Sequence, residues 1–139
     1  MITLAEYLMG RQVSHGLECS PDILRNSSLM VQLANRALVN ARFDGVVLQP
    51  RADGTMVNSG WRPPSINAKT PGASKTSLHM TGEAIDINDP DGSLDAWAAK
   101  NCTTVLQVLG LWLEAPAATP GWCHLQCKPP RSGARIFNP

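Results

Sequence analysis

Apolar side chains follow a helical period over residues 23–41. They recur at steps of three and four residues, which places them on one face of an α-helix for about five turns. Ser20, Pro21 and Asp22 precede this stretch in the order of an N-cap, a first-position proline and a first-turn acid. We therefore expect a long helix from residue 21 and a short one over residues 2–9. The stripe predicts core packing by Ile23, Ser27, Met30, Val31, Ala34, Ala37, Leu38 and Ala41.

Two β-prone runs follow, at residues 46–49 and 56–61. Pro50 and the turn signal Asp53-Gly54 separate them, so we expect a β-hairpin. Residues 62–78 contain three prolines and many small polar residues, which favours an ordered loop over a helix or strand. Loops of that length often carry function.

The second half of the chain predicts two more strands around one helix. Residues 84–87 predict a strand and residues 89–92 a turn. Ser93 can cap a helix that runs through Trp97 toward Leu109, and residues 122–127 predict the last strand. Separate helices and short antiparallel-type strands indicate an α+β fold, with a small antiparallel sheet packed against helices.

Length and composition indicate one globular domain, residues 1–139. Hydrophobic residues make up 43% of the chain and charged residues 17%, which argues against a disordered chain. The formal net charge of +1 provides no basic surplus for a polyanion, so we expect no nucleic acid partner. The start, MITLAEYLMGRQ, lacks the features of a secretory signal, and no stretch is long enough for a membrane span. We expect a soluble protein made in the cytoplasm.

The four cysteines are too few and too irregularly spaced to predict a disulfide scaffold. Along an extended strand Cys123 and Cys127 would lie about 13 Å apart, too far for a mutual disulfide. They are consistent with metal binding or with two small packing residues on one face. We expect reduced thiols at Cys19, Cys102, Cys123 and Cys127.

Two predicted strands present possible metal ligands. The two-residue period of a strand puts His124 and Gln126 on one face and the cysteines on the other. Asp86 lies between two isoleucines that face an apolar layer, so its carboxylate needs a polar partner. With His79, these residues offer two imidazoles and one carboxylate, a three-ligand zinc set that leaves the fourth position for water. Taken singly, each has an ordinary alternative, as a core histidine or a turn-capping acid.

Three short motifs resemble those of a known family and stand in the same order along the chain. SLHMTGEAID, residues 77–86, resembles the S-x-H-x-x-G-x-A-x-D signature of the zinc D-alanyl-D-alanine carboxypeptidase family. SGWRP at residues 59–63 resembles that family's segment of serine, glycine, an aromatic residue and arginine, and WCH at residues 122–124 resembles its closing W-x-H. The flanks, with MGR at residues 9–11 and Phe137 near the end, are similar to a branch common in phages and prophages.

The resemblance implies a domain of the lysostaphin, carboxypeptidase and hedgehog type. Its activity would be hydrolysis of peptide bonds in peptidoglycan stem or cross-link peptides, as an endolysin-like D,D-carboxypeptidase or endopeptidase. His79, Asp86 and His124 carry over as ligands of one zinc ion, whose bound water attacks the scissile amide. The expected partner is a peptidoglycan peptide, bound by a monomer that acts on the cell wall after release or within a virion.

The resemblance also assigns substrate contacts. Arg62 corresponds to the family arginine that contacts substrate and oxyanion oxygens, a role that suits a guanidinium fork, and a surface salt bridge is the alternative. Ser77 corresponds to a substrate hydrogen-bonder, or else it shapes the loop before His79. Gln126 is a candidate from the strand period alone: on the predicted His124 face, it contacts substrate, supports a ligand by a hydrogen bond, or is simply exposed. Gly82 supplies backbone geometry between two ligands.

The general base departs from the family pattern. The family places a glutamate three residues before the last histidine, where this chain has Gly121. Glu114 is the nearest replacement, because the loop after it returns to the same strand, and a solvated acid is the alternative. Glu83 is expected on the face opposite the ligands, and Asp89 and Asp91 in a turn.

Two other classes of function are also consistent with the sequence. A catalytically weak metal-binding module, for cell-wall binding or virion structure, would keep the fold without a base. A metal-free structural domain would require His79, Asp86 and His124 to lie far apart. The cleaved bond, D,D or L,D, depends on pocket walls formed by residues distant in sequence.

Overall fold

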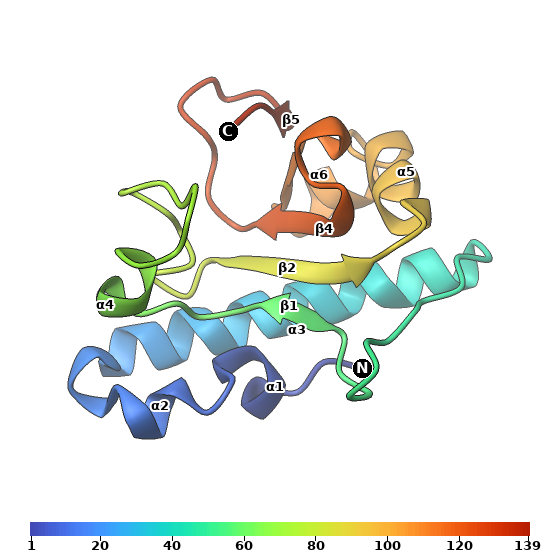
Figure 1. Cartoon of the computed structure of the whole chain (residues 1–139). Helices are drawn as coiled ribbons and strands as arrows, with labels where there is room; N and C mark the ends of the chain where they lie inside the picture. Colours follow the sequence, from blue (N-terminus) through green and yellow to red (C-terminus); the bar gives the residue numbers. More distant parts are fainter.

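The computed structural model describes residues 1–139 and contains a five-stranded sheet with helices packed around it (Figure 1). The strands lie in the order β1-β2-β4-β3-β5. Neighbouring strands are antiparallel except for β3 and β5, which are parallel. This architecture confirms the predicted α+β fold. The strands are β1 Val57–Ser59, β2 Ala84–Asp89, β3 Trp112–Glu114, β4 Gly121–Gln126 and β5 Ile136–Phe137.

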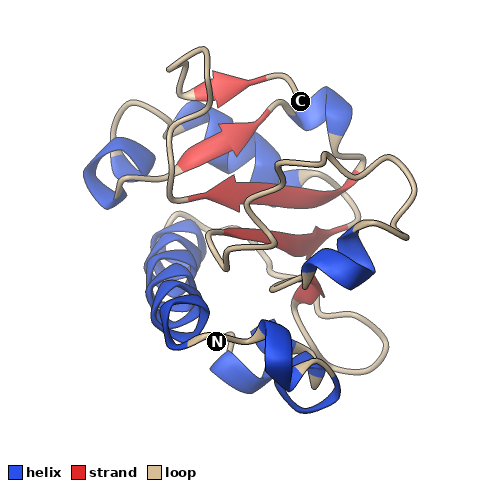
Figure 2. Ribbon diagram, turned by 90° about the vertical axis from the view of Figure 1, so that its left-hand side faces the viewer, coloured by secondary structure: helices blue, strands red, loops and turns tan.

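The long helix α3, Pro21–Phe43, lies along one side of the sheet (Figure 2). The Ser20 side chain accepts a hydrogen bond from the Ile23 amide at 3.3 Å, as expected of an N-cap. The predicted stripe is buried from Ser27 to Ala41, and only Ile23 is partly exposed. Its apolar members pack with Ile85, Ile87 and Leu125 in one core. Alternation along β2 and β4 therefore sends their apolar side chains toward the core and leaves the opposite face for the site.

The N-terminal segment folds as short pieces: α1 Leu4–Leu8, α2 Arg11–Ser14 and a 3₁₀ turn at Gly16–Glu18. Tyr7 of α1 is fully buried. Its hydroxyl donates a hydrogen bond to the Ala84 carbonyl at 2.8 Å, and its backbone carbonyl accepts one from the Trp61 amide at 3.1 Å. The start of the chain is thus bonded to β2 and to the SGWRP segment.

The predicted hairpin of residues 46–49 and 56–61 is wrong. Residues 46–49 form no strand, and β1 pairs with β2 instead. The expected turn is present, because the Arg51 amide donates to the Thr55 carbonyl at 2.8 Å. Pro50 has no amide hydrogen for a strand ladder, and Asn88 of β2 binds the Gln49 carbonyl through its side chain at 2.9 Å. β2 therefore bonds the Gln49 carbonyl through a side chain and not through a strand ladder.

The single helix predicted from Ser93 toward Leu109 is two helices, α5 Ser93–Lys100 and α6 Val105–Leu109. The N-cap of α5 is Gly92, with φ of 72°, and Ser93 is the first helical residue. A turn at residues 101–104 separates the two helices. None of the helices is both long and apolar enough to cross a lipid bilayer.

Asp89 is the acid that caps α5, although a turn position was expected. It ends β2, is 3% exposed, and accepts hydrogen bonds from the Leu94 and Asp95 amides at 3.0 and 2.8 Å. Asp91 does lie in the turn, where it accepts from the Ser93 amide at 3.0 Å. Negative charge at a helix N-terminus explains the burial of Asp89.

Other local predictions need smaller corrections. The segment 62–78 is not all loop, because Pro64–Asn67 forms the short helix α4. Residues 122–127 are not the last strand, because β5 follows β4. Neither β3 nor β5 was predicted, since strands of three and two residues are too short to show a period. All four cysteines are free, and Cys123 and Cys127 pack in and against the core.

Candidate metal centre

The site is a row of side chains that crosses the sheet on the face opposite the core. Asp86 of β2 is the register partner of His124 of β4. Leu113 of β3 pairs with Leu125, so Glu114 comes beside His124 one step along the ladder. Glu114 in turn is the register partner of Phe137 on β5. Register partners share a face of a sheet, so four strands each contribute one side chain to this row.

His79 joins the row from the turn that precedes β2. The turn bends sharply at Gly82, where φ is 76°. A side chain there would also bring its Cβ to 2.6 Å from Ser27 Oγ on α3. Glycine is therefore needed both for the backbone conformation and for the close packing of the turn on the helix.

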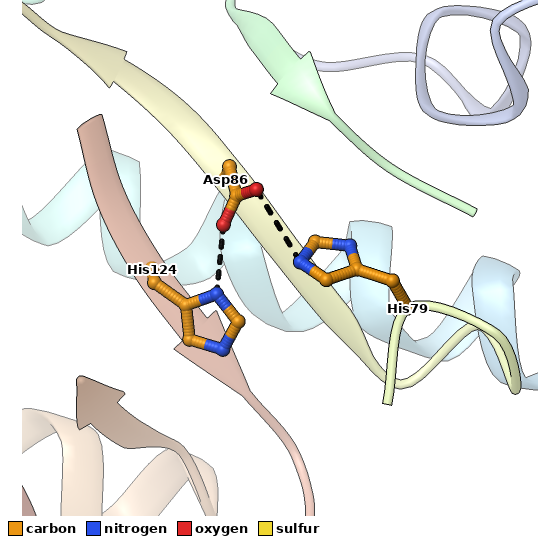
Figure 3. Close-up of side chains that lie close together, drawn as sticks. All are labelled: His79, Asp86 and His124. Atoms are coloured by element: carbon orange, nitrogen blue, oxygen red, sulfur yellow. Dashed lines mark hydrogen bonds and ion pairs between the residues drawn. The ribbon is translucent and has the colours of Figure 1, made fainter. Parts of the chain in front are cut away.

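The carboxylate of Asp86 lies between the two imidazoles (Figure 3). Its Oδ1 is 2.7 Å from His124 Nδ1, and its Oδ2 is 3.3 Å from His79 Nε2. One ligand atom from each of the three residues lies within 4.8 Å of the others, an arrangement that could hold a metal ion. The three side chains are close together, whereas the metal-free alternative required them to be far apart.

The tautomer of His79 suits a metal ligand. Its Nδ1 lies 2.8 Å from the Gly60 carbonyl oxygen, which can only accept, so Nδ1 carries the hydrogen. In the neutral imidazole, Nε2, the nitrogen that faces Asp86, is then left with a free lone pair. Metal-ligating histidines usually donate their second ring N–H in this way. Two imidazoles and one carboxylate with an oriented ring fit the donor preference of zinc.

Burial and charge shape the ionisation of the row. Burial acts to raise the pKa of Asp86, but the charge of His79 and the hydrogen bond from His124 outweigh it and hold the pKa below its usual range. Burial acts to lower the pKa of His124, and the hydrogen bond and charge of Asp86 outweigh it, so this pKa is raised. An ionised carboxylate between two imidazoles favours a positive charge in the space between the three side chains. Protons on the imidazoles or a bound metal ion can supply that charge.

Glu114 borders the cluster. Its Oε2 lies 3.7 Å from His124 Nδ1, and its side chain is largely buried. Burial raises the pKa of this carboxyl, although the charge of His124 opposes the rise. The alternative of a solvated acid does not match this position.

Arg62 and Ser77 form one hydrogen-bonded unit at the edge of the site. The Arg62 Nη2 donates to Ser77 Oγ at 3.1 Å, and its Nε donates to Asn67 Oδ1 at 2.9 Å. The Arg62 amide also donates to the His79 carbonyl at 3.0 Å. The two side-chain bonds hold the guanidinium without a salt bridge, and the backbone bond ties this segment to His79. Asn67, on α4, was missed because the sequence predicted a loop there.

Gln126 follows His124 on the same face, as the strand period predicts. It is 6% exposed, so simple exposure is not its explanation. Its Nε2 donates to the Lys128 carbonyl at 2.6 Å. This bond fixes the amide in the wall of the site.

These side chains line one cavity of about 790 Å³. The loop 70–78 and the segment 129–139 form much of its wall, and pockets of this volume suit ligands larger than a single amino acid. Glu83 does not line this cavity, and its carboxylate lies 3.5 Å from Lys128 Nζ. The candidate residues that line the cavity are Arg62, Ser77, His79, Asp86, Glu114, His124 and Gln126.

The fold is α+β, and its sheet presents two histidines and one aspartate to a cavity. This combination places the protein in the class of candidate metal-dependent hydrolases. Comparison with known families narrows this class, because residues 22–113 match the family model described as Peptidase M15. The chain belongs to the Peptidase M15 family, and family membership indicates a metallopeptidase. No curated protein and no solved structure matches the chain. The matched segment contains His79 and Asp86 and ends one residue before Glu114.

Proposed function

We propose that this protein is a zinc-dependent peptidase that hydrolyses peptide bonds in peptidoglycan stem or cross-link peptides, in the manner of a phage endolysin. The observation that carries the proposal is the convergence of His79, Asp86 and His124 beside Glu114, in a chain of the M15 family. The substrate is a peptide, and the products are a new carboxylate and a new amine.

His79 Nε2, the Asp86 carboxylate and His124 Nδ1 are the proposed ligands of one zinc ion. Zinc, when bound, supplies Lewis-acid chemistry, which acidifies water and polarises a carbonyl group. The Gly60 carbonyl keeps His79 in the required tautomer through its 2.8 Å hydrogen bond. The buried position of both histidines limits competition from bulk water.

Glu114 is the proposed general base and acid. Its carboxylate takes a proton from the attacking water and later gives a proton to the leaving amine nitrogen. A raised carboxyl pKa favours this exchange, because catalysis is most efficient when the group titrates near the working pH. Proton transfer of this kind typically contributes about 10²- to 10⁴-fold to the rate.

Arg62 is proposed to bind a substrate carboxylate or the developing oxyanion. Asn67 and Ser77 already hold its guanidinium, so the side chain loses little conformational freedom when the substrate binds. Ser77 and Gln126 line the same cavity and are proposed to hydrogen-bond the peptide.

The direct test is digestion of purified peptidoglycan with and without chelator, with the products identified by mass. We expect new muropeptide fragments only in the absence of chelator, about one zinc per chain, and no cleavage by His124→Ala. The masses also distinguish a carboxypeptidase from an endopeptidase. Zinc-free protein, with cleavage unaffected by His124→Ala, contradicts the proposal.

One observation favours a second function. Gly121 provides no carboxylate in the slot where the family has a glutamate, and its φ of 94° is a conformation in which any side chain is strained. The second proposal is therefore a catalytically weak metal-binding module for cell-wall binding or virion structure. Glu114→Gln separates the two functions, because it removes turnover and leaves zinc bound in a peptidase. The weak module binds peptidoglycan with no turnover in either form.

A further inference from the structure

The C-terminal strand β5 lies next to the strand that carries Glu114. The Leu113 amide donates to the Arg135 carbonyl at 3.0 Å, and the Ala115 amide donates to the Phe137 carbonyl at 2.7 Å. These two bonds flank Glu114 on both sides. β5 therefore fixes the backbone of the residue proposed as the base.

Arg135 anchors β5 on β3. Its guanidinium carbon lies 4.3 Å from the centre of the Trp112 ring, and its Nη1 donates to the Leu111 carbonyl at 2.9 Å. A cation over an aromatic face together with a charge-assisted hydrogen bond is a specific attachment. The strand of only two residues is thus held by side chains as well as by its ladder.

Phe137 ends the row of side chains on the site face. Its ring meets the imidazole of His124 edge to face, with centroids 6.2 Å apart and planes at 81°. Phe137 also lines the cavity beside Glu114. The imidazole therefore has Asp86 on one side and an aromatic ring on another, which restricts the directions in which Nδ1 can point.

We propose that Phe137 is a positioning residue of the metal centre: it orients the imidazole of His124 and closes the β5 side of the cavity. This inference rests on the proposed function, since it assigns His124 as a metal ligand. Side chains that orient a ligand typically change metal affinity or activity by about 10- to 100-fold when they are removed.

The test compares Phe137→Ala with Ile136→Ala, a matched control on the same strand whose side chain points to the other face and is 36% exposed. Zinc affinity is measured by competition with a chromogenic chelator, and the cobalt-substituted proteins are compared by visible absorption. We expect Phe137→Ala to weaken zinc affinity about 10-fold or more and to change the cobalt spectrum. Ile136→Ala should match the wild type in both.

Two further variants guard against a folding defect. Phe137→Tyr keeps the ring and should restore the wild-type affinity and spectrum. Phe137→Leu keeps apolar volume without the ring and should show part of the loss. If Phe137→Ala fails to fold, Phe137→Leu decides, because an affinity and spectrum equal to the wild type overturn the proposal.

Failure of the proposed function is seen in the wild-type protein, which then leaves peptidoglycan uncut. Failure of the Phe137 inference is seen in the variants, when Phe137→Ala equals Ile136→Ala in affinity and spectrum. In an active enzyme, Phe137→Ala should lower kcat about 10- to 100-fold with a smaller change in KM, because the cavity still binds the peptide.

Discussion

His79 is oriented by Gly60, whose carbonyl oxygen lies 2.8 Å from the imidazole Nδ1. Gly60 in turn packs against Tyr7 of α1 so closely that a Cβ on Gly60 would lie 1.9 Å from the Tyr7 carbonyl oxygen. The SGWRP segment therefore connects α1 to the proposed metal ligand His79, because Gly60 packs against the first and hydrogen-bonds the second. The start of the chain, which lies outside the family match, contributes to the geometry of the site.

Gly60→Ala should accordingly impair both stability and metal binding. The clash is with backbone atoms, so the segment must shift, at a cost of about 1–3 kcal/mol or more of unfolding free energy. The shift moves the acceptor for His79 and should weaken zinc affinity about 10-fold or more. Denaturant unfolding and zinc competition measure the two effects. Gly16→Ala is the control, because a Cβ there meets nothing within 4 Å.

Zinc should stabilise the folded protein. A ligand that binds only the folded state at a concentration 1,000 times its Kd adds about 4 kcal/mol of stability. We therefore expect added zinc to raise Tm and excess chelator to lower it. His124→Ala should lose this response. His15→Ala, at a histidine outside the cluster, should keep it, and an equal response from both variants contradicts the proposed ligand set.

The sequence predicted which candidate ligands lie together better than it predicted the strands around them. Strand alternation separated Asp86 from its isoleucine neighbours and His124 from the cysteines, each on its own strand, and the direct pairing of the two residues in the ladder brings them together. The partner of β1 could not be predicted, because proximity along the chain favoured a hairpin with residues 46–49. In the structure β1 pairs with β2, and Asn88 of β2 bonds the Gln49 carbonyl through its side chain. Phe137 could not be linked to His124, since β5 has two residues and shows no period.

Asp89 shows a different limit. The cluster of Asp, Pro and Gly at residues 89–92 has the composition of a turn, and acids that cap helices occur in the same composition. Only the three-dimensional position of α5 distinguishes a buried cap from an exposed turn residue. Asn67 was missed for a similar reason, since prolines favour both loops and the first turn of a helix.

Asp95→Asn should change how stability depends on pH. Burial raises the pKa of Asp95, and its Oδ1 has no hydrogen-bond partner. The folded state then keeps this proton to a higher pH than the unfolded state, so stability falls as the pH rises from the unfolded pKa, about 3.9, through the folded one. Asparagine has no charge to bury, and Asp95→Asn should gain stability relative to the wild type across that window.

Asp91→Asn is the contrasting variant. Hydrogen bonds from Ser93 lower the pKa of Asp91, so its contribution is present at neutral pH and is lost as the pH falls through the lowered pKa. The two variants should thus differ from the wild type in opposite directions at neutral pH. Urea unfolding from pH 3 to pH 8 measures both, and a parallel response of the two variants is the contradictory result.

Arg62→Lys tests whether the guanidinium fork matters beyond its charge. Lysine keeps the positive charge but cannot reproduce the two directed bonds to Asn67 and Ser77. We expect kcat/KM on a peptidoglycan peptide to fall about 10²-fold, the size typical for loss of one oxyanion contact, with zinc still bound at one ion per chain. Arg51→Lys is the control, since Arg51 is half exposed, lies beside Asp53 and does not line the cavity. An Arg62→Lys enzyme as active as Arg51→Lys shows that a point charge is sufficient and that the hydrogen bonds to Asn67 and Ser77 serve the fold alone.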